Sequence, residues 1–167
     1  MAPRAAARLE HLGFSNVFEY KPGKVDWMAA GLPTEGENST HPRAADVARK
    51  DVPTCALDER LGDVAKRAGA AGWDAAVVVD ERRTVLGLLR TAELRKNPEL
   101  RIEEAMRPGP STFRPYVTIK EMADYMVEHD LASSPITTSY GVLIGLLLRS
   151  DALAKAGGCP DCSRKLI

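Results

Sequence analysis

Hydrophobic and polar positions follow the same order twice along this chain. A helical spacing of apolar residues over 58–70 is followed by the apolar runs 75–79 and 85–89, separated by a polar turn. The same helical spacing returns over 118–129, again followed by two apolar strands, a turn and a short helix. The apolar positions of the two helices are Leu61, Val64, Ala65 and Ala68, then Met122, Ala123, Met126 and Val127. Asp58 is the expected N-cap of the first helix. The pattern predicts a mixed α/β (α+β) fold.

The two halves match without a gap. Gly87 and Gly145 stand 58 positions apart (145 minus 87), and the same offset relates other positions. The matching pairs are Arg49 and Arg107, Thr54 and Thr112, Leu61 and Ile119, Asp63 and Glu121, Ala65 and Ala123, and Val78 and Ile136. A repeat of this length is a supersecondary unit that buries its apolar face against its twin. We expect a first β-α-β-β-α repeat over 44–100 and a second over 101–155.

An acidic residue lies six positions after each repeated glycine, where a strand gives way to a helix. These residues are Glu93 and Asp151. A carboxylate in this place can accept two hydrogen bonds from a ribose diol. It can equally complement the positive end of a helix dipole, and on the residues alone this second interpretation is favoured.

The repeat resembles the CBS domain (named for cystathionine beta-synthase), which occurs in tandem pairs called Bateman modules. The first copy carries Asp46-Val47-Ala48, Thr54-Cys55, Val77-Val78-Val79-Asp80 and Gly87-Leu88-Leu89-Arg90-x-x-Glu93-Leu94. The second carries Glu104-Ala105-Met106, Thr112-Phe113, Pro135-Ile136-Thr137-Thr138 and Gly145-Leu146-Leu147-Leu148-x-x-Asp151. The resemblance covers about two-thirds of the chain and implies an adenosine nucleotide, such as AMP or ATP, bound between the repeats.

The resemblance also implies which residues meet such a ligand. The expected site consists of Thr112, Ser133, Ser134, Pro135, Ile136, Arg149 and Asp151, with Arg107 as another candidate for a phosphate. A weaker second site consists of Thr54, Val77, Val78, Arg90 and Glu93. Arg90 and Leu148 both stand where the family has threonine. Arg90 either closes its site or neutralises a phosphate, with closure favoured, so we expect the ligand at Asp151 rather than at Glu93.

Residues 1–36 have a different character. They predict a helix over 3–12, a strand over 16–20 and a helix over 25–30, too little for an independent core. Leu12-Gly13-Phe14-x-Asn16-Val17, Gly23-Lys24-x-Asp26-Trp27 and Ala30-Gly31-Leu32-Pro33-x-Glu35-Gly36 resemble the closing third of a rhodanese domain. A rhodanese needs a cysteine nucleophile about five residues before the arginine that Arg4 resembles, and the nearest cysteine is Cys55. We therefore expect a remnant without sulfurtransferase chemistry, either packed on the repeats or trailing from them, or else a start codon placed too far downstream. The polar stretch 37–43 is the expected linker.

Composition narrows the function classes. The 167 residues are 44% hydrophobic and 28% charged, and 23 Lys and Arg balance 23 Asp and Glu. This balance indicates neither a nucleic-acid partner nor an anionic membrane surface. Without a long apolar run or a secretory signal, the chain is expected in the cytoplasm.

The cysteines, three in number, predict no disulfide framework. In the tail 156–167, Cys159 and Cys162 have the spacing of half a zinc site. A dimer could complete four thiolates, but a disordered tail with free thiols is favoured and no metal is expected.

These observations predict a regulatory ligand sensor rather than an enzyme. A nucleotide between the repeats would favour one packing of the pair, and a protein partner would respond to the difference. We expect a symmetric homodimer formed through the repeats. The alternatives are a structural dimerisation module without a ligand and an accessory unit of a sulfurtransferase system.

Overall fold

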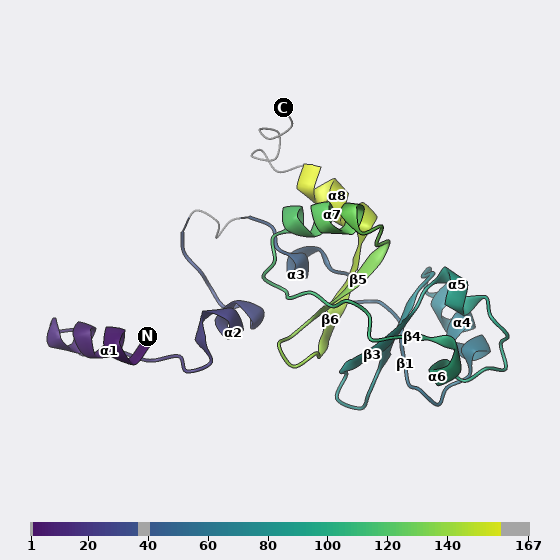
Figure 1. Ribbon diagram of the computed structural model, residues 1–167, viewed down its shortest axis with the longest axis horizontal. Coiled ribbons are helices and arrows are strands. Elements are labelled where there is room, and N and C mark those ends of the chain that lie inside the picture. Colours follow the sequence, from purple (N-terminus) through teal and green to yellow (C-terminus); the bar gives the residue numbers. More distant parts are fainter. Residues whose placement is uncertain (1, 37–40, 158–167) are drawn as a thin grey trace.

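The computed structural model describes residues 2–36 and 41–157, and its helices and strands from α3 onward form two repeats (Figure 1). The first repeat contains α3 (Ala44–Val47), β1 (Thr54–Cys55), α4 (Leu61–Ala70), β2 (Ala76–Val79), β3 (Val85–Leu89) and α5 (Thr91–Leu94). The second contains α6 (Ile102–Ala105), β4 (Arg107–Pro108), α7 (Ile119–Glu128), β5 (Ser133–Thr137), β6 (Leu143–Leu148) and α8 (Arg149–Gly157). The helices α1 (Ala2–His11) and α2 (Gly23–Ala29) precede them.

Strand register confirms the repeat residue by residue. Cys55 lies opposite Val78 in the first repeat, and Phe113 lies opposite Ile136 in the second. The hairpin pairing Ala76 with Leu89 recurs as Ser134 with Leu147, and a bulge follows at the same place in both hairpins. The mixed helix and strand fold that the sequence predicts is therefore the observed one.

The opening segment of each repeat packs against the other repeat. β4 pairs with β3 of the first repeat, while Arg49 bridges to Leu146 in β6 of the second. The helices follow the strands. Ala44 of α3 is buried among residues of α7, α8 and β6, whereas Ile102 of α6 is buried among residues of α4, β2 and β3. Figure 1 shows α3 beside the second hairpin and α6 beside the first repeat. The two repeats are thus intertwined.

The turns of the two hairpins meet each other. Thr84 bridges to Val142, its own counterpart in the repeat. Val85 N–H donates to the Gly141 carbonyl (3.0 Å), and Leu143 N–H donates to the Arg83 carbonyl (2.9 Å). Because equivalent residues pair reciprocally and antiparallel, the repeats are related by an approximate two-fold axis.

The two long helices differ from the sequence prediction in two details. Arg60, and not Asp58, is the N-cap of α4, which begins three residues later than expected. On α7, Met122, Ala123 and Met126 are buried as predicted, but Val127 is 54% exposed. At about 100° per residue, Val127 lies farther round the helix from Met126 than Ala123 does, and so falls at the edge of the buried face.

The segment before the repeats has no sheet of its own. Residues 16–20 form no strand in the part of the chain that the structure describes, because strand hydrogen bonding needs a partner strand. Figure 1 shows α1 apart from the repeats and α2 beside them. The segment therefore trails at α1 and packs on the repeats after α2. Among the residues that the structure describes, no helix is long and apolar enough to cross a bilayer.

Candidate functional site

Two arginine–carboxylate pairs connect the repeats in a crossed arrangement. Arg49 of the first repeat donates to both carboxylate oxygens of Asp151 in α8, at 2.7 and 3.1 Å. Its counterpart Arg107 lies with Nε 3.7 Å from Oε1 of Glu93 in α5. Both acids lie in the first turn of a short helix, where the sequence places them. Each acid therefore faces the opening segment of the other repeat.

A cleft opens between the repeats on the Glu93 side. Its volume is about 230 Å³. It is lined by Leu88 and Arg90 of the first repeat and by Arg107, Pro108, Pro110, Ser111, Leu131, Ser133 and Ser134 of the second. We call this hollow the open cleft. Its charged lining side chains are those of Arg90 and Arg107, and Arg107 is paired with Glu93 at 3.7 Å.

Arg90 separates the open cleft from a second hollow. That hollow, of about 210 Å³, is lined by Asp74, Ala75, Arg90, Thr91, Ala132, Ser133, Leu148 and Ser150. Nη2 of Arg90 donates to the Ser133 carbonyl at 3.3 Å, a long contact, while Nε of Arg90 is buried without a hydrogen-bond partner among the described residues. A buried N–H group in this state costs folding free energy unless something else accepts from it.

On the other side of the two-fold axis, the equivalent space is filled. Trp73, the counterpart of Leu131, is buried there with Val52, Ala75 and Leu146. The Arg49 guanidinium carbon lies 5.6 Å from the centre of the Trp73 ring. Because Arg49 also binds Asp151, the Asp151 carboxylate belongs to this filled side.

A family comparison agrees with this geometry. The CBS domain model matches residues 44–99 and 102–158. The chain belongs to the CBS-domain family. The two matches follow the two repeats. Comparison with the curated proteins gives no match.

Solved structures share the fold of this CBS pair. The cytosolic domain of the Mg²⁺ channel MgtE, in complex with ATP, has 22% identity and a TM-score of 0.62, with 68% of this chain and 48% of that chain covered. The CBS domain pair of protein MJ0100, in complex with 5′-methylthioadenosine and S-adenosyl-L-methionine, has 19% identity and a TM-score of 0.63, with 71% and 98% covered. A putative acetoin utilization protein from Vibrio cholerae has 20% identity and a TM-score of 0.63, with 76% and 98% covered. The chain spans about half the length of the MgtE domain.

The structure redistributes the residues of the two sites expected from the resemblance. Ser133 and Ser134 line the open cleft with Arg90 and Arg107, whereas Asp151 binds Arg49 on the filled side. The expected grouping of Ser133 and Ser134 with Asp151 therefore does not occur around the open cleft.

The remaining expected residues lie elsewhere. Pro135, Ile136, Val77 and Val78 are buried within the hairpins, Thr54 lies in β1, and Thr112 is exposed. Arg149 donates to Asp130 at 2.8 Å. Sequence reasoning missed Leu88, Pro108, Pro110, Ser111 and Leu131 as cleft residues. The repeat offset alone does not reveal that the opening segment of one copy completes the site of the other.

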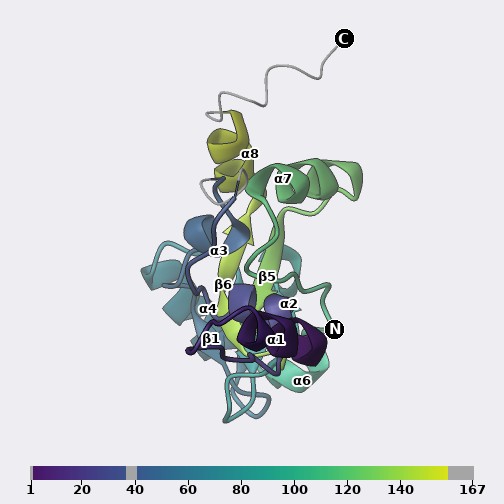
Figure 2. The ribbon, with the colours of Figure 1, turned by 90° about the vertical axis from the view of Figure 1, so that its left-hand side faces the viewer.

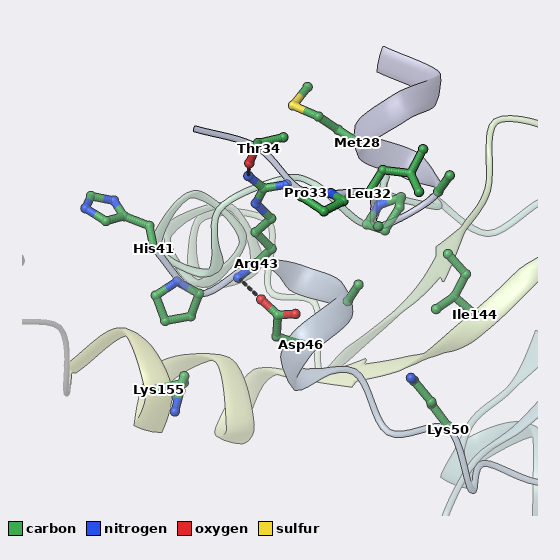
Figure 3. Close-up of a pocket in the computed structure, with 15 residues that line it drawn as sticks. Met28, Leu32, Pro33, Thr34, His41, Arg43, Asp46, Lys50, Ile144 and Lys155 are labelled. Carbon is green, nitrogen blue, oxygen red and sulfur yellow. Dashed lines mark hydrogen bonds between the residues drawn. The ribbon is translucent and has the colours of Figure 1, made fainter. Parts of the chain in front are cut away.

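A larger hollow lies where the segment after α2 meets the opening segment of the first repeat and residues of the second (Figure 3). It has a volume of about 750 Å³. The Arg43 guanidinium donates to the Thr34 hydroxyl at 2.7 Å, and the Arg43 backbone N–H donates to Asp46 at 2.8 Å. Figure 3 shows Leu32, Pro33 and Thr34 crossing above α3. This contact fixes the segment to the CBS pair.

Cys55 is unsuited to sulfur chemistry. It is buried in β1, and burial raises the pKa of its thiol to about 12. At neutral pH the group is a thiol and not the nucleophilic thiolate. Within 2–36 and 41–157, no cluster of His, Cys, Asp and Glu side chains could hold a metal ion. Cys159 and Cys162 lie outside the described residues.

Proposed function

We propose that this CBS pair is a regulatory ligand sensor that binds an adenosine nucleotide in the open cleft. The structures of similar fold that contain ATP, or 5′-methylthioadenosine and S-adenosyl-L-methionine, support the adenosine class. The hydroxyl groups of Ser111 and Ser133 supply donors and acceptors beside the apolar side chains of Leu88 and Leu131. The Ser134 hydroxyl already donates to the Ser111 carbonyl at 3.1 Å and offers an acceptor. This combination suits a flat polar ring held against an apolar surface.

The buried Nε of Arg90 carries the proposal. It is an unpaired cationic donor, its side chain borders both hollows, and Arg107 adds a second guanidinium. With Glu93 counted, the cleft keeps one excess positive charge. A phosphate group would satisfy that charge and accept from Arg90, so a nucleotide should bind more tightly than its nucleoside.

The small volume of the open cleft links ligand binding to a change in the packing of the repeats. The open cleft is smaller than the roughly 300–1,000 Å³ of typical ligand pockets, and the second hollow continues it beyond Arg90. A nucleotide therefore needs Arg90 to leave the Ser133 carbonyl. That movement breaks a contact between the repeats, and a partner can respond to the altered packing.

This proposal places the ligand at the Glu93 side and reverses the preference expected from the resemblance. Arg49 occupies both carboxylate oxygens of Asp151, at 2.7 and 3.1 Å, whereas Oε1 of Glu93 has only Arg107 at 3.7 Å, although Oε2 accepts from the Arg90 backbone N–H at 3.0 Å. A ribose diol can displace the longer contact more easily. Glu93 would then accept from the ribose while Arg90 and Arg107 meet the phosphate.

Calorimetry with AMP and adenosine tests the proposal. Arg90→Leu places at this position the residue that its counterpart Leu148 already has. Loss of a charge-assisted hydrogen bond should weaken AMP binding by on the order of 2 kcal/mol, roughly thirtyfold, and leave adenosine binding nearly unchanged. Arg82→Leu removes an exposed arginine from the hairpin turn and should bind like the parent. If none of AMP, ATP, adenosine and S-adenosylmethionine binds the parent protein, the pair is a structural module.

The location, the assembly and the partner of the sensor are part of the same proposal. The sensor would act as a cytoplasmic homodimer without catalysis of its own and would pass its state to a protein partner. The resemblance of residues 1–36 to a rhodanese domain stays a prediction, and so does a role of the chain as an accessory unit of a sulfurtransferase system.

A further inference from the structure

We propose that this chain binds one ligand and not two, because Trp73 occupies the second cleft that the repeat would otherwise form. The inference rests on the proposed function of the open cleft. It concerns the opposite side of the two-fold axis, and it follows from comparing each lining residue with its counterpart 58 positions away.

The counterparts of the open-cleft lining form part of the core. Leu131, Pro110 and Leu88 correspond to Trp73, Val52 and Leu146. Trp73 and Val52 are each 7% exposed, while Leu146 at 0% and its counterpart Leu88 at 1% are equally buried, so the two sides differ at Trp73 and Val52. The side chains of Trp73, Val52 and Leu146 pack in one cluster with residues of both repeats. Leu131 and Pro110, by contrast, remain partly exposed beside the hollow. The larger indole therefore fills the volume that leucine leaves empty.

Asp51 and Arg49 keep Trp73 in place. The open cleft has no carboxylate corresponding to the first, and the counterpart of the second is held more loosely. The indole N–H donates to Asp51 at 3.3 Å, and the counterpart of Asp51 is Gly109, which offers no carboxylate. Arg49 lies over the ring and makes a two-point hydrogen bond to Asp151, whereas Arg107 stands 3.7 Å from Glu93. Both oxygens of the ribose acceptor of the second cleft are thus bound by Arg49, whereas Glu93 keeps one oxygen, Oε1, without a close hydrogen bond, since only Oε2 accepts from the Arg90 N–H at 3.0 Å. The space for a base in the second cleft is also occupied.

Exchanging the two residues tests the inference by calorimetry with AMP. The parent should bind one AMP per chain. Leu131→Trp should fill the open cleft and weaken AMP binding at least tenfold, while Trp73→Leu should raise the stoichiometry towards two. Circular dichroism shows whether each variant folds. Since Trp73 is buried, Trp73→Leu is the variant at risk, and Leu131→Trp then carries the test. A parent stoichiometry of two, a folded Trp73→Leu variant that still binds one, or undiminished binding by Leu131→Trp would overturn the inference.

A measurement without ligand separates this inference from the proposed function. In a Trp27→Phe variant only Trp73 emits, since the chain has two tryptophans. Its fluorescence should be blue-shifted and protected from acrylamide. Quenching as strong as that of free tryptophan would show an open second cleft and overturn the inference, whatever AMP does. If the emission is protected and AMP does not bind, Trp73 still fills the second cleft, and only the proposed function is overturned.

Discussion

At the scale of single residues, Gly87 and Gly145 let the opening segments of the two repeats cross closely over the strands. A Cβ on Gly145 would lie 2.6 Å from the Arg49 carbonyl oxygen and 3.3 Å from the Ala48 Cβ. A Cβ on Gly87 would meet the Met106 side chain and the Arg107 carbonyl, and these two residues are the counterparts of Ala48 and Arg49 in the repeat. The glycine that begins the repeated motif is therefore needed for contact between the repeats.

Gly145→Ala should lower the free energy of unfolding by about 1–3 kcal/mol, the usual cost of overpacking a core. Arg49 cannot easily move away, since it exchanges two 2.9 Å backbone hydrogen bonds with Leu146. Urea unfolding measures the effect. Gly69→Ala is the control: its added Cβ meets nothing within 4 Å and lies in α4, so stability should stay level or rise by up to about 1 kcal/mol. Equal stability of the parent and Gly145→Ala would refute the crowding argument.

At the scale of elements, the sequence predicts which helices and hairpins form but does not predict which of them pack together. Hydrophobic spacing predicted α4, α7 and both hairpins because each depends on local periodicity. The partners of α3 and α6 depend on contacts between distant segments, and a repeat looks the same whether a copy packs on itself or on its twin. This is why Asp151 was expected with Ser133 and Ser134, although its carboxylate binds Arg49 of the other repeat. Residues 16–20 alternate like a strand but have no strand beside them.

The capping of α7 gives a prediction at this scale. Thr118 accepts from the Glu121 N–H at 3.3 Å, and Glu121 accepts from the Thr118 N–H at 3.2 Å, a reciprocal capping box. Thr118→Ala should lower the free energy of unfolding by about 1 kcal/mol, while Thr118→Ser keeps the hydroxyl and most of the stability. Thermal unfolding of the three proteins measures both effects. Serine and alanine variants of equal stability would show that the hydroxyl does not cap the helix.

At the scale of the whole molecule, α7 and α8 form an outer layer of the second repeat. They pack against each other, and Figures 1 and 2 show them side by side at the end of the second hairpin. Their inner faces bury Met122, Met126, Ala152 and Ala156. Apolar groups also remain outside, because Val127 is 54% and Leu153 is 47% exposed. The layer thus carries more apolar surface than one chain covers.

We predict that this layer joins two chains in a symmetric homodimer. In the double variant Val127→Glu and Leu153→Glu, charged groups would be buried without partners at such an interface, so dimers should dissociate at tens of micromolar. Multi-angle light scattering gives the mass of each species, against 18.1 kDa for one chain. Val25→Glu changes a valine of similar exposure, 52%, on α2 outside the repeats, and should leave the mass unchanged. A parent protein that is monomeric at this concentration would refute the dimer. Dissociation by Val25→Glu alone would place the interface on the segment before the repeats instead.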